Sequence, residues 1–250
     1  MCLAVLFGAG ASKGAGNVVP APPPLGGELY AALRFAYPGS WDQICDDLDS
    51  SFRRDFETAM DALWSCDYHP LRAKWLVDMG AYFAQFEPAT DGEEDLYTHF
   101  LKTLVVVGML PRTAFATLNY ECILDVAASR LELGVDYFGD APTNGCVLIW
   151  KPHGACNLVP SMGLQIVNSE LSGRALYEGG VEPIKLAEML QRHAEGNSLP
   201  PAMSLYAPGK PSPVAPTLVA TTRDQWRAWV GSSDVCIIIG ARPNFADSHI

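Results

Sequence analysis

Five short apolar runs along the chain have the length and composition of buried β-strands. The first, residues 3–7, is apolar throughout and ends in glycines, which is typical of a strand covered on both faces in a parallel sheet. Strand-like runs follow at residues 113–117, 147–150, 217–221 and 235–239. We therefore expect a sheet assembled from segments spread over the whole chain.

Helical periodicity dominates between the first two of these strands. Apolar residues recur there at intervals of three and four positions, as in Phe52, Phe56 and Met60, which is the spacing of one helix face. We interpret residues 41–107 as a helical insertion after the first strand. The individual helices that the pattern predicts are residues 28–35, 71–86, 93–107, 122–133, 184–193 and 224–230.

Strands and helices alternate outside the insertion, and this order predicts an α/β fold with a Rossmann-like parallel sheet flanked by helices. We assign residues 1–250 to one domain. Residues 157–216 are rich in glycine and proline, and we expect one helix in them and a loop over residues 207–216. The unusual polar residues follow the carboxyl ends of strands, where open α/β sheets bind ligands.

Composition narrows the choice of partners. The chain has 49% hydrophobic and 18% charged residues and a net charge of −11, so it is globular and its surface repels nucleic-acid backbones. A dinucleotide is compatible with this charge, because local backbone N–H groups capture a small anion. No segment has the pattern of a signal peptide or a membrane span, and no pair of the seven cysteines has C-x-x-C spacing. We expect a cytoplasmic protein without a metal site.

The segment from Gly8 to Ser12 reads GAGAS and follows the first strand. Glycines let a backbone approach a pyrophosphate closely, and the N–H groups that follow can face the anion. A tight turn without a ligand is the alternative interpretation. Lys13 occupies the place of the third glycine of the dehydrogenase fingerprint, and Glu28 lies in a helical pattern instead of at a strand end. These departures disfavour a hydride-transfer enzyme.

Two further strand ends carry groups suited to chemistry on a ribose. Asn119 follows the second strand and could hold a ribose hydroxyl or a water, although an asparagine there could equally cap the next helix. His153 follows the third strand and precedes Gly154, so a titratable imidazole with little steric cover would share the edge with the glycine loop. Gly240, after the last strand, either permits close approach to an adenosine or forms a simple turn.

Taken in order, these segments resemble the SIR2-like family, which has the sirtuin fold, and especially its bacterial NAD-consuming branch. The resemblance rests on the GAGAS loop, on residues 117–121 and 151–154, and on residues 238–240 with 247–250. It implies NAD as the substrate, Asn119 and His153 at the catalytic positions, and a pyrophosphate held by Ser12 and the loop N–H groups. The cofactor-binding positions it implies are Gly8, Ala9, Gly10, Ala11, Ser12, Thr117, Gly240 and Asp247.

The chain departs from the protein-deacetylating sirtuins in one respect that affects function. Those enzymes carry a four-cysteine zinc module after the catalytic histidine, and here only Cys156 and Cys236 follow His153. The resemblance therefore favours an NAD⁺ hydrolase of antiphage defence, activated by homo-oligomerisation or by a partner protein. An NAD-dependent deacylase and a non-catalytic sensor of NAD or ADP-ribose are the alternatives. The family usually continues beyond the position of Ile250, so either the sheet is short or the sequence is a piece of a longer protein.

Overall fold

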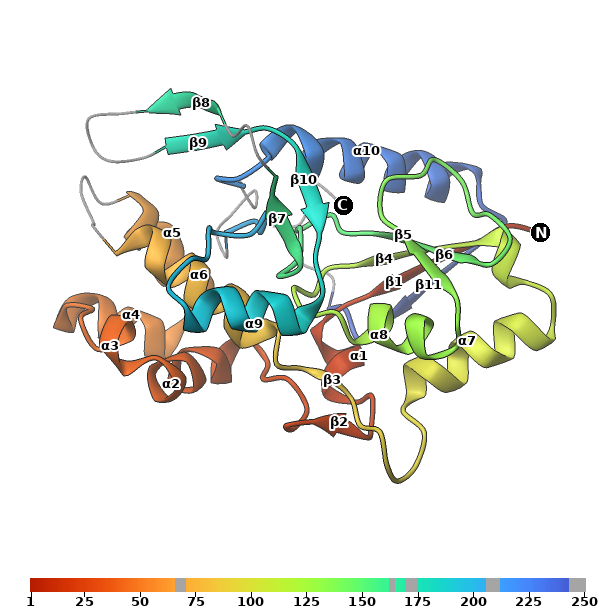
Figure 1. The fold of residues 1–250 in the computed structure, drawn as a ribbon, viewed down its shortest axis with the longest axis horizontal. Helices are drawn as coiled ribbons and strands as arrows, with labels where there is room; N and C mark the ends of the chain where they lie inside the picture. The colour runs from red at the N-terminus through yellow and green to blue at the C-terminus, as the bar shows by residue number, and fades with distance from the viewer. Residues whose placement is uncertain (66–70, 162–164, 170–174, 206–211, 243–250) are drawn as a thin grey trace.

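The computed structural model describes residues 1–65, 71–161, 165–169, 175–205 and 212–242. Its centre is a five-stranded sheet in the order β11-β1-β4-β6-β5, in which every neighbouring pair is parallel. The α/β prediction with a Rossmann-like parallel sheet is confirmed (Figure 1). The strands are β1 (Leu3–Phe7), β4 (Thr113–Thr117), β5 (Gly134–Asp136), β6 (Cys146–Trp150) and β11 (Val235–Ile239).

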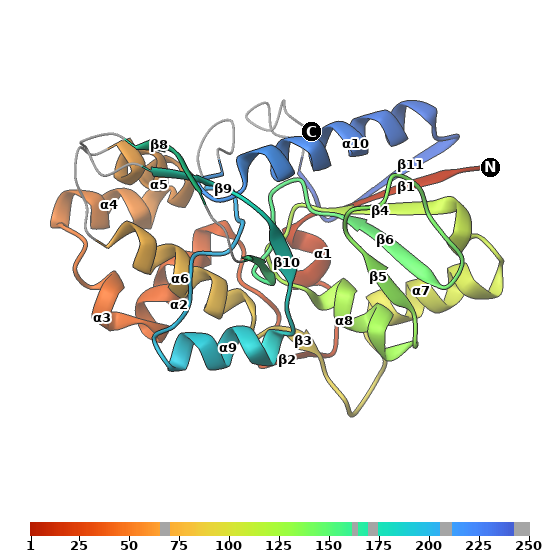
Figure 2. The same ribbon diagram turned by 45° about the horizontal axis from the view of Figure 1, so that its top comes forward.

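Alternate residues of the strands enter two apolar layers. On one face, Phe7 and Phe115 pack in the larger core with helices α7 (Leu96–Val106) and α8 (Ile123–Arg130). On the other face Trp150 packs against Trp226 of α10 (Pro216–Ser232). Figure 2 shows α10 on one side of the sheet and α7 and α8 on the opposite side.

The strand predicted over residues 217–221 is wrong, because these residues begin α10. Pro216 occupies the first turn of this helix, where its missing N–H costs nothing. The buried residues of the helix are Val219, Thr222 and Trp226, at intervals of three and four. The β-branched residues of a five-residue window resemble a strand, and the helical period becomes visible only over the full 17 residues.

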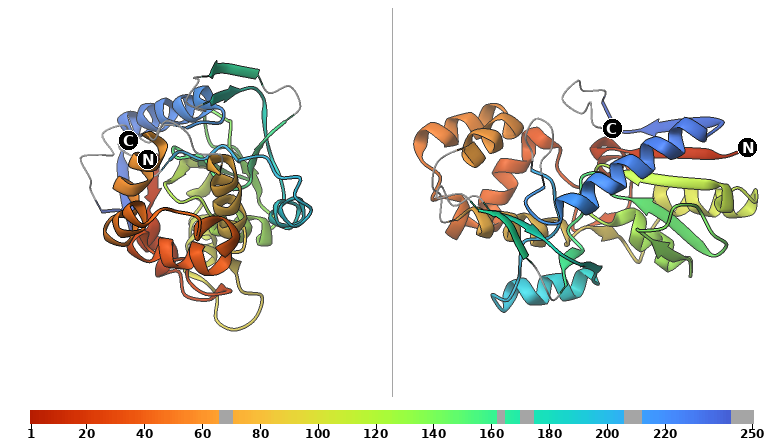
Figure 3. Two further views of the ribbon diagram at one scale, coloured as in Figure 1. Left: turned by 90° about the vertical axis from the view of Figure 1, so that its left-hand side faces the viewer. Right: turned by 90° about the horizontal axis from the view of Figure 1, so that it is seen from above.

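The predicted helical insertion is present, and it starts earlier than residue 41. Its helices up to residue 83 lie beyond the carboxyl ends of the strands, at the opposite end of the molecule from the N-terminus, whereas α7 packs on a face of the sheet (Figures 1 and 3). Trp41, Trp75 and Phe52 fill its interior. After the short α1 (Ala9–Lys13), its helices are α2 (Gly26–Ala36), α3 (Pro38–Trp41), α4 (Asp46–Arg54), α5 (Phe56–Ser65) and α6 (Arg72–Phe83), followed by α7.

Residues 157–216 hold more structure than the single helix expected there, α9 (Leu186–Ala194). Short antiparallel strand pairs accompany it, and runs of three to five residues carry too little pattern to be recognised among glycines and prolines. The pairs are β7 (Leu158–Pro160) with β10 (Val181–Pro183) and β8 (Gln165–Ser169) with β9 (Ala175–Glu178). Elsewhere β2 (Val18–Val19) pairs with β3 (Glu87–Pro88), and a 3₁₀ turn, Leu110–Arg112, precedes β4. Within the described segments, no helix is both long and apolar enough to cross a membrane.

Candidate functional site

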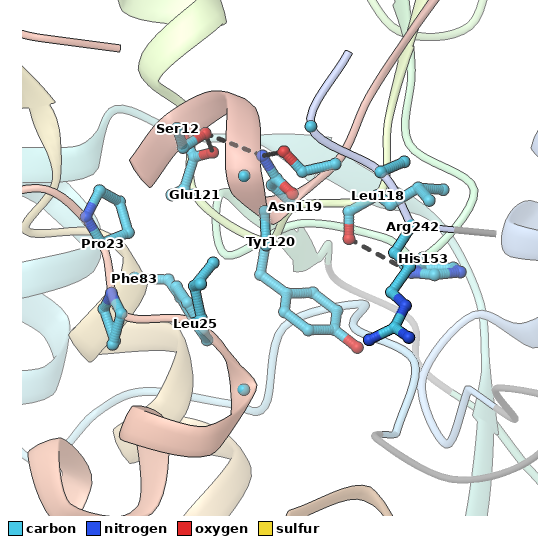
Figure 4. A pocket seen from close by; sticks show the side chains of 17 residues that line it. Ser12, Pro23, Leu25, Phe83, Leu118, Asn119, Tyr120, Glu121, His153 and Arg242 are labelled. Atoms are coloured by element: carbon cyan, nitrogen blue, oxygen red, sulfur yellow. Dashed lines mark hydrogen bonds between the residues drawn. The ribbon is translucent and has the colours of Figure 1, made fainter. Parts of the chain in front are cut away.

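A cavity of about 550 Å³ opens at the carboxyl edge of the sheet, and all four predicted strand ends contribute to it (Figure 4). Its volume is within the range of small-molecule sites. In Figure 4, Arg242 and His153 lie toward one side of the cavity, and Pro23 and Phe83 lie toward the other. The described residues that line it are Gly8, Ala9, Gly10, Ser12, Pro23, Pro24, Leu25, Gly26, Phe83, Leu118, Asn119, Tyr120, Glu121, His153, Gly240, Ala241 and Arg242.

The glycines of the N-terminal loop are required by packing against the turn after β11. A Cβ atom on Gly10 would lie 2.9 Å from the carbonyl oxygen of Gly240. Gly240 itself has φ +65°, and a Cβ atom there would lie 1.9 Å from the nitrogen of Ala11. Both glycines therefore allow two loops to meet backbone to backbone, which explains the GAGAS spacing even without a ligand.

Three N–H groups of this loop are already bonded to backbone carbonyls. Gly8 donates to Ile239, Gly10 donates to Gly240, and Ala11 donates to Gly8, each at 2.9 Å. The expectation that the loop N–H groups face an anion is therefore wrong for these three. The first two join the loop to the end of β11 and the turn after it, and the third closes the loop on itself.

Ser12 is buried beneath the cavity at the centre of a hydrogen-bond network. Its hydroxyl donates to Oε1 of Glu121 at 2.5 Å and accepts from Nδ2 of Asn119 at 2.8 Å. Because its single proton is used, the hydroxyl of Tyr97, 2.8 Å away, donates to it. Every hydrogen-bonding position of the Ser12 hydroxyl is thus occupied within the protein. Ser12 therefore lies where it can orient Asn119. The sequence predicts that its hydroxyl holds the pyrophosphate, but in the structure this hydroxyl has no position left for a ligand.

Asn119 is fixed with its amide oxygen as the free acceptor. Its Nδ2 donates to the carbonyl oxygen of Gly8 at 3.2 Å and to Ser12. Because a carbonyl only accepts, this contact determines which amide atom is nitrogen. No donor among the described residues reaches Oδ1, so this oxygen can accept a hydrogen bond from a ligand or a water. The alternative role as helix cap is wrong, because Cys122 is the N-cap of α8.

Thr117 stabilises the backbone of the turn that carries Asn119. Its Oγ1 accepts a hydrogen bond from the Asn119 backbone N–H at 3.1 Å, and its side chain is buried. It is absent from the residues that line the cavity. Thr117 thus positions Asn119, and its predicted direct contact with a cofactor has no support in this geometry.

His153 lines the cavity in a fixed orientation. Its Nδ1 lies 3.2 Å from the carbonyl oxygen of Leu118, which accepts only, so a neutral ring carries its proton on Nδ1 and its basic lone pair on Nε2. Gly154 holds the loop close to a neighbouring segment: its φ is +72°, and a Cβ atom would lie 1.8 Å from the carbonyl oxygen of Ala202. The predicted His-Gly pair is therefore a histidine placed by a tightly packed turn.

Glu121 is a site residue that the sequence interpretation missed. It lines the cavity, is 4% exposed, and accepts at Oε2 from the Ile123 N–H at 2.6 Å in addition to the Ser12 hydroxyl. Burial raises the pKa of this carboxyl above its usual range, against the opposing effect of these two hydrogen bonds and of Lys151. A single acid within the otherwise apolar stretch of residues 120–124 was the signal that could have identified it.

The raised pKa of Glu121 predicts a particular pH dependence of stability. A carboxyl whose pKa is higher in the folded state stabilises the fold fully below its unfolded pKa of about 4.3 and loses that contribution as pH rises through the folded pKa. We expect the stability of wild-type protein relative to Glu121→Gln to fall as pH rises from 4.5 toward 8. Urea unfolding across this range tests it, with the exposed Glu182→Gln as control. A pH-independent difference would contradict the assignment.

A buried ion pair lies behind the site, on the side of α8. Lys151 Nζ is 2.8 Å from Oδ2 of Asp125, and both side chains are almost fully buried. Tyr137 donates to the other carboxylate oxygen at 2.7 Å. Burial is the largest single effect and would lower the pKa of Lys151, but Asp125, Cys122 and Glu121 together outweigh it, and the pKa lies above its ordinary value. Lys151 also reaches the carbonyl oxygen of Glu121 at 3.5 Å, so the pair supports the turn that carries Asn119 and Glu121.

The four predicted segments thus meet at one cavity, with Gly240 included and Asp247 outside the described residues. Ala11 packs behind the loop and lines an apolar groove beside α7 instead.

A scan against protein-family models matched no family, and a search of curated proteins found no matching relative.

Proposed function

We propose that this chain is an NAD⁺ hydrolase that releases nicotinamide and ADP-ribose and depletes NAD in bacterial antiphage defence. The observation that carries the proposal is that Asn119 and His153 line one cavity, each oriented by a hydrogen bond to a backbone carbonyl. The cavity lies at the carboxyl edge of a parallel sheet, where such folds bind nucleotides. The resemblance to SIR2-like proteins supports the choice of NAD.

The proposed reaction breaks the bond between C1′ of the ribose and the pyridinium nitrogen. The bonding electron pair goes to nitrogen, neutral nicotinamide leaves, and positive charge develops on the ribose. Water then bonds to C1′ and passes one proton to Nε2 of His153 as general base. Oδ1 of Asn119 accepts a hydrogen bond from this water and holds it against the sugar. ADP-ribose and one proton complete the balance.

The direct test is nicotinamide release, followed by chromatography, from NAD mixed with the purified 250-residue chain. We expect release that requires no acylated peptide. Absence of release, both alone and under enforced oligomerisation, would contradict the proposal. Release that depends on an acylated peptide would instead identify a deacylase, and binding of NAD without turnover would identify a sensor.

A further inference from the structure

We propose that Arg242 binds the pyrophosphate of the dinucleotide, in place of the Ser12 hydroxyl. The inference rests on the proposed function, since it concerns the same ligand in the same cavity. It starts from a mismatch: the Ser12 hydroxyl and three of the loop N–H groups that the sequence assigns to the pyrophosphate are used for other contacts. The Ser12 hydroxyl already makes all three hydrogen bonds that it can form, and the N–H groups of Gly8, Gly10 and Ala11 donate to backbone carbonyl oxygens.

The occupied donors of the loop matter because the chain is acidic and would repel a pyrophosphate. The net charge is −11, and Glu121 adds a carboxyl to the lining of the cavity. A pyrophosphate carries two negative charges, and moving it from water into such a site without a cationic partner is costly. A positive charge within the cavity would offset this cost where the loop N–H groups are already bonded.

Arg242 is the only lysine or arginine among the described residues that line the cavity. Within the described part of the chain it forms no ion pair, and it is exposed at the cavity mouth. Its backbone position is fixed by the packing of Gly240 and Ala241 against the N-terminal loop, since a Cβ atom on Gly8 would lie 2.6 Å from Cα of Ala241.

The chemistry of the side chain fits this role. A guanidinium presents a planar fork of N–H donors that can bond two phosphate oxygens at once, and it is charged at every physiological pH. Arg242 lies toward the same side of the cavity as His153 (Figure 4). A pyrophosphate held there would be joined to a ribose near His153 and Asn119. The close packing of Gly8 and Gly10 against Gly240 then fixes the position of the backbone that carries Arg242. Arg242 thereby becomes a binding residue of the proposed hydrolase.

The test compares binding of ADP-ribose and of adenosine, which lacks the pyrophosphate, to wild-type protein and to Arg242→Gln by calorimetry. We expect ADP-ribose to bind the variant roughly 10- to 100-fold more weakly, as for loss of a charge-assisted contact, while adenosine changes less than about twofold. Arg242→Lys should bind ADP-ribose with intermediate affinity. The control is Arg112→Gln, which removes an exposed arginine at the opposite edge of the sheet. Circular dichroism confirms that each variant is folded.

The possible failures are distinguishable. If wild-type protein binds ADP-ribose and Arg242→Gln binds it within twofold, the role of Arg242 is overturned while the proposed function stands. Equal loss of ADP-ribose and adenosine would also overturn it, because the variant would then have damaged the cavity as a whole. If wild-type protein neither binds ADP-ribose nor releases nicotinamide, both the inference and the proposed function fail.

Discussion

Replacement of His153 by alanine is expected to lower the rate of nicotinamide release by about 10²- to 10⁴-fold, which is the usual contribution of a positioned general base. The reason is geometric. Nδ1 faces the carbonyl oxygen of Leu118, so Nε2 is the nitrogen that can accept a proton from the attacking water. Initial rates at saturating NAD measure the effect on the chemical step, and ADP-ribose affinity measures binding separately.

The matched variants separate chemistry from folding. His99→Ala removes an exposed histidine of α7 and should leave the rate unchanged. Asn119→Ala should also abolish release, because it removes the Oδ1 acceptor and frees Gly8 and Ser12 from their amide contacts. If His153→Ala retained more than about a tenth of the wild-type rate while folded, His153 would not be the base, and the water would have to be activated by another group.

The sheet and the location of the site could be predicted because parallel strands impose a strong local pattern. A strand buried on both faces is a continuous apolar run, and the carboxyl ends of parallel strands meet at one edge. The runs ending at Phe7, Thr117, Trp150 and Ile239 therefore sufficed to bring the loop glycines, Asn119 and His153 together. None of these steps required knowledge of the helical insertion.

The roles of individual residues within the site could not be predicted, because they depend on contacts between distant segments. Ser12 and Glu121 are 109 residues apart, and only the folded structure shows that their hydrogen bond uses the serine hydroxyl. In the same way, the glycines of a GAGAS loop look identical whether they approach a ligand or, as here, the turn at Gly240. Local sequence thus indicated the edge of the sheet correctly, but it could not show that the Ser12 hydroxyl and three loop N–H groups are already bonded within the protein.

Loss of one partner from the buried pair of Lys151 and Asp125 should be the most damaging single change to stability. We expect Lys151→Met to lower the free energy of unfolding by about 3–5 kcal/mol, because it leaves the Asp125 carboxylate buried without its counter-ion. Urea unfolding monitored by tryptophan fluorescence measures it. The surface pair of Lys102 and Glu94 is the control: Lys102→Met should cost less than about 1 kcal/mol.

A double variant shows whether the charge itself is responsible. Adding Asp125→Asn to Lys151→Met removes the uncompensated charge and keeps an amide oxygen that accepts from the Tyr137 hydroxyl. We expect the double variant to recover at least half of the lost stability, since neutral replacements of buried ion pairs are tolerated far better than half-removed pairs. If the double variant is no more stable than Lys151→Met, the loss comes from the lysine's packing against Tyr137 and not from its charge. The Lys151 side chain would then stabilise the turn at Glu121 through its packing and not through its charge.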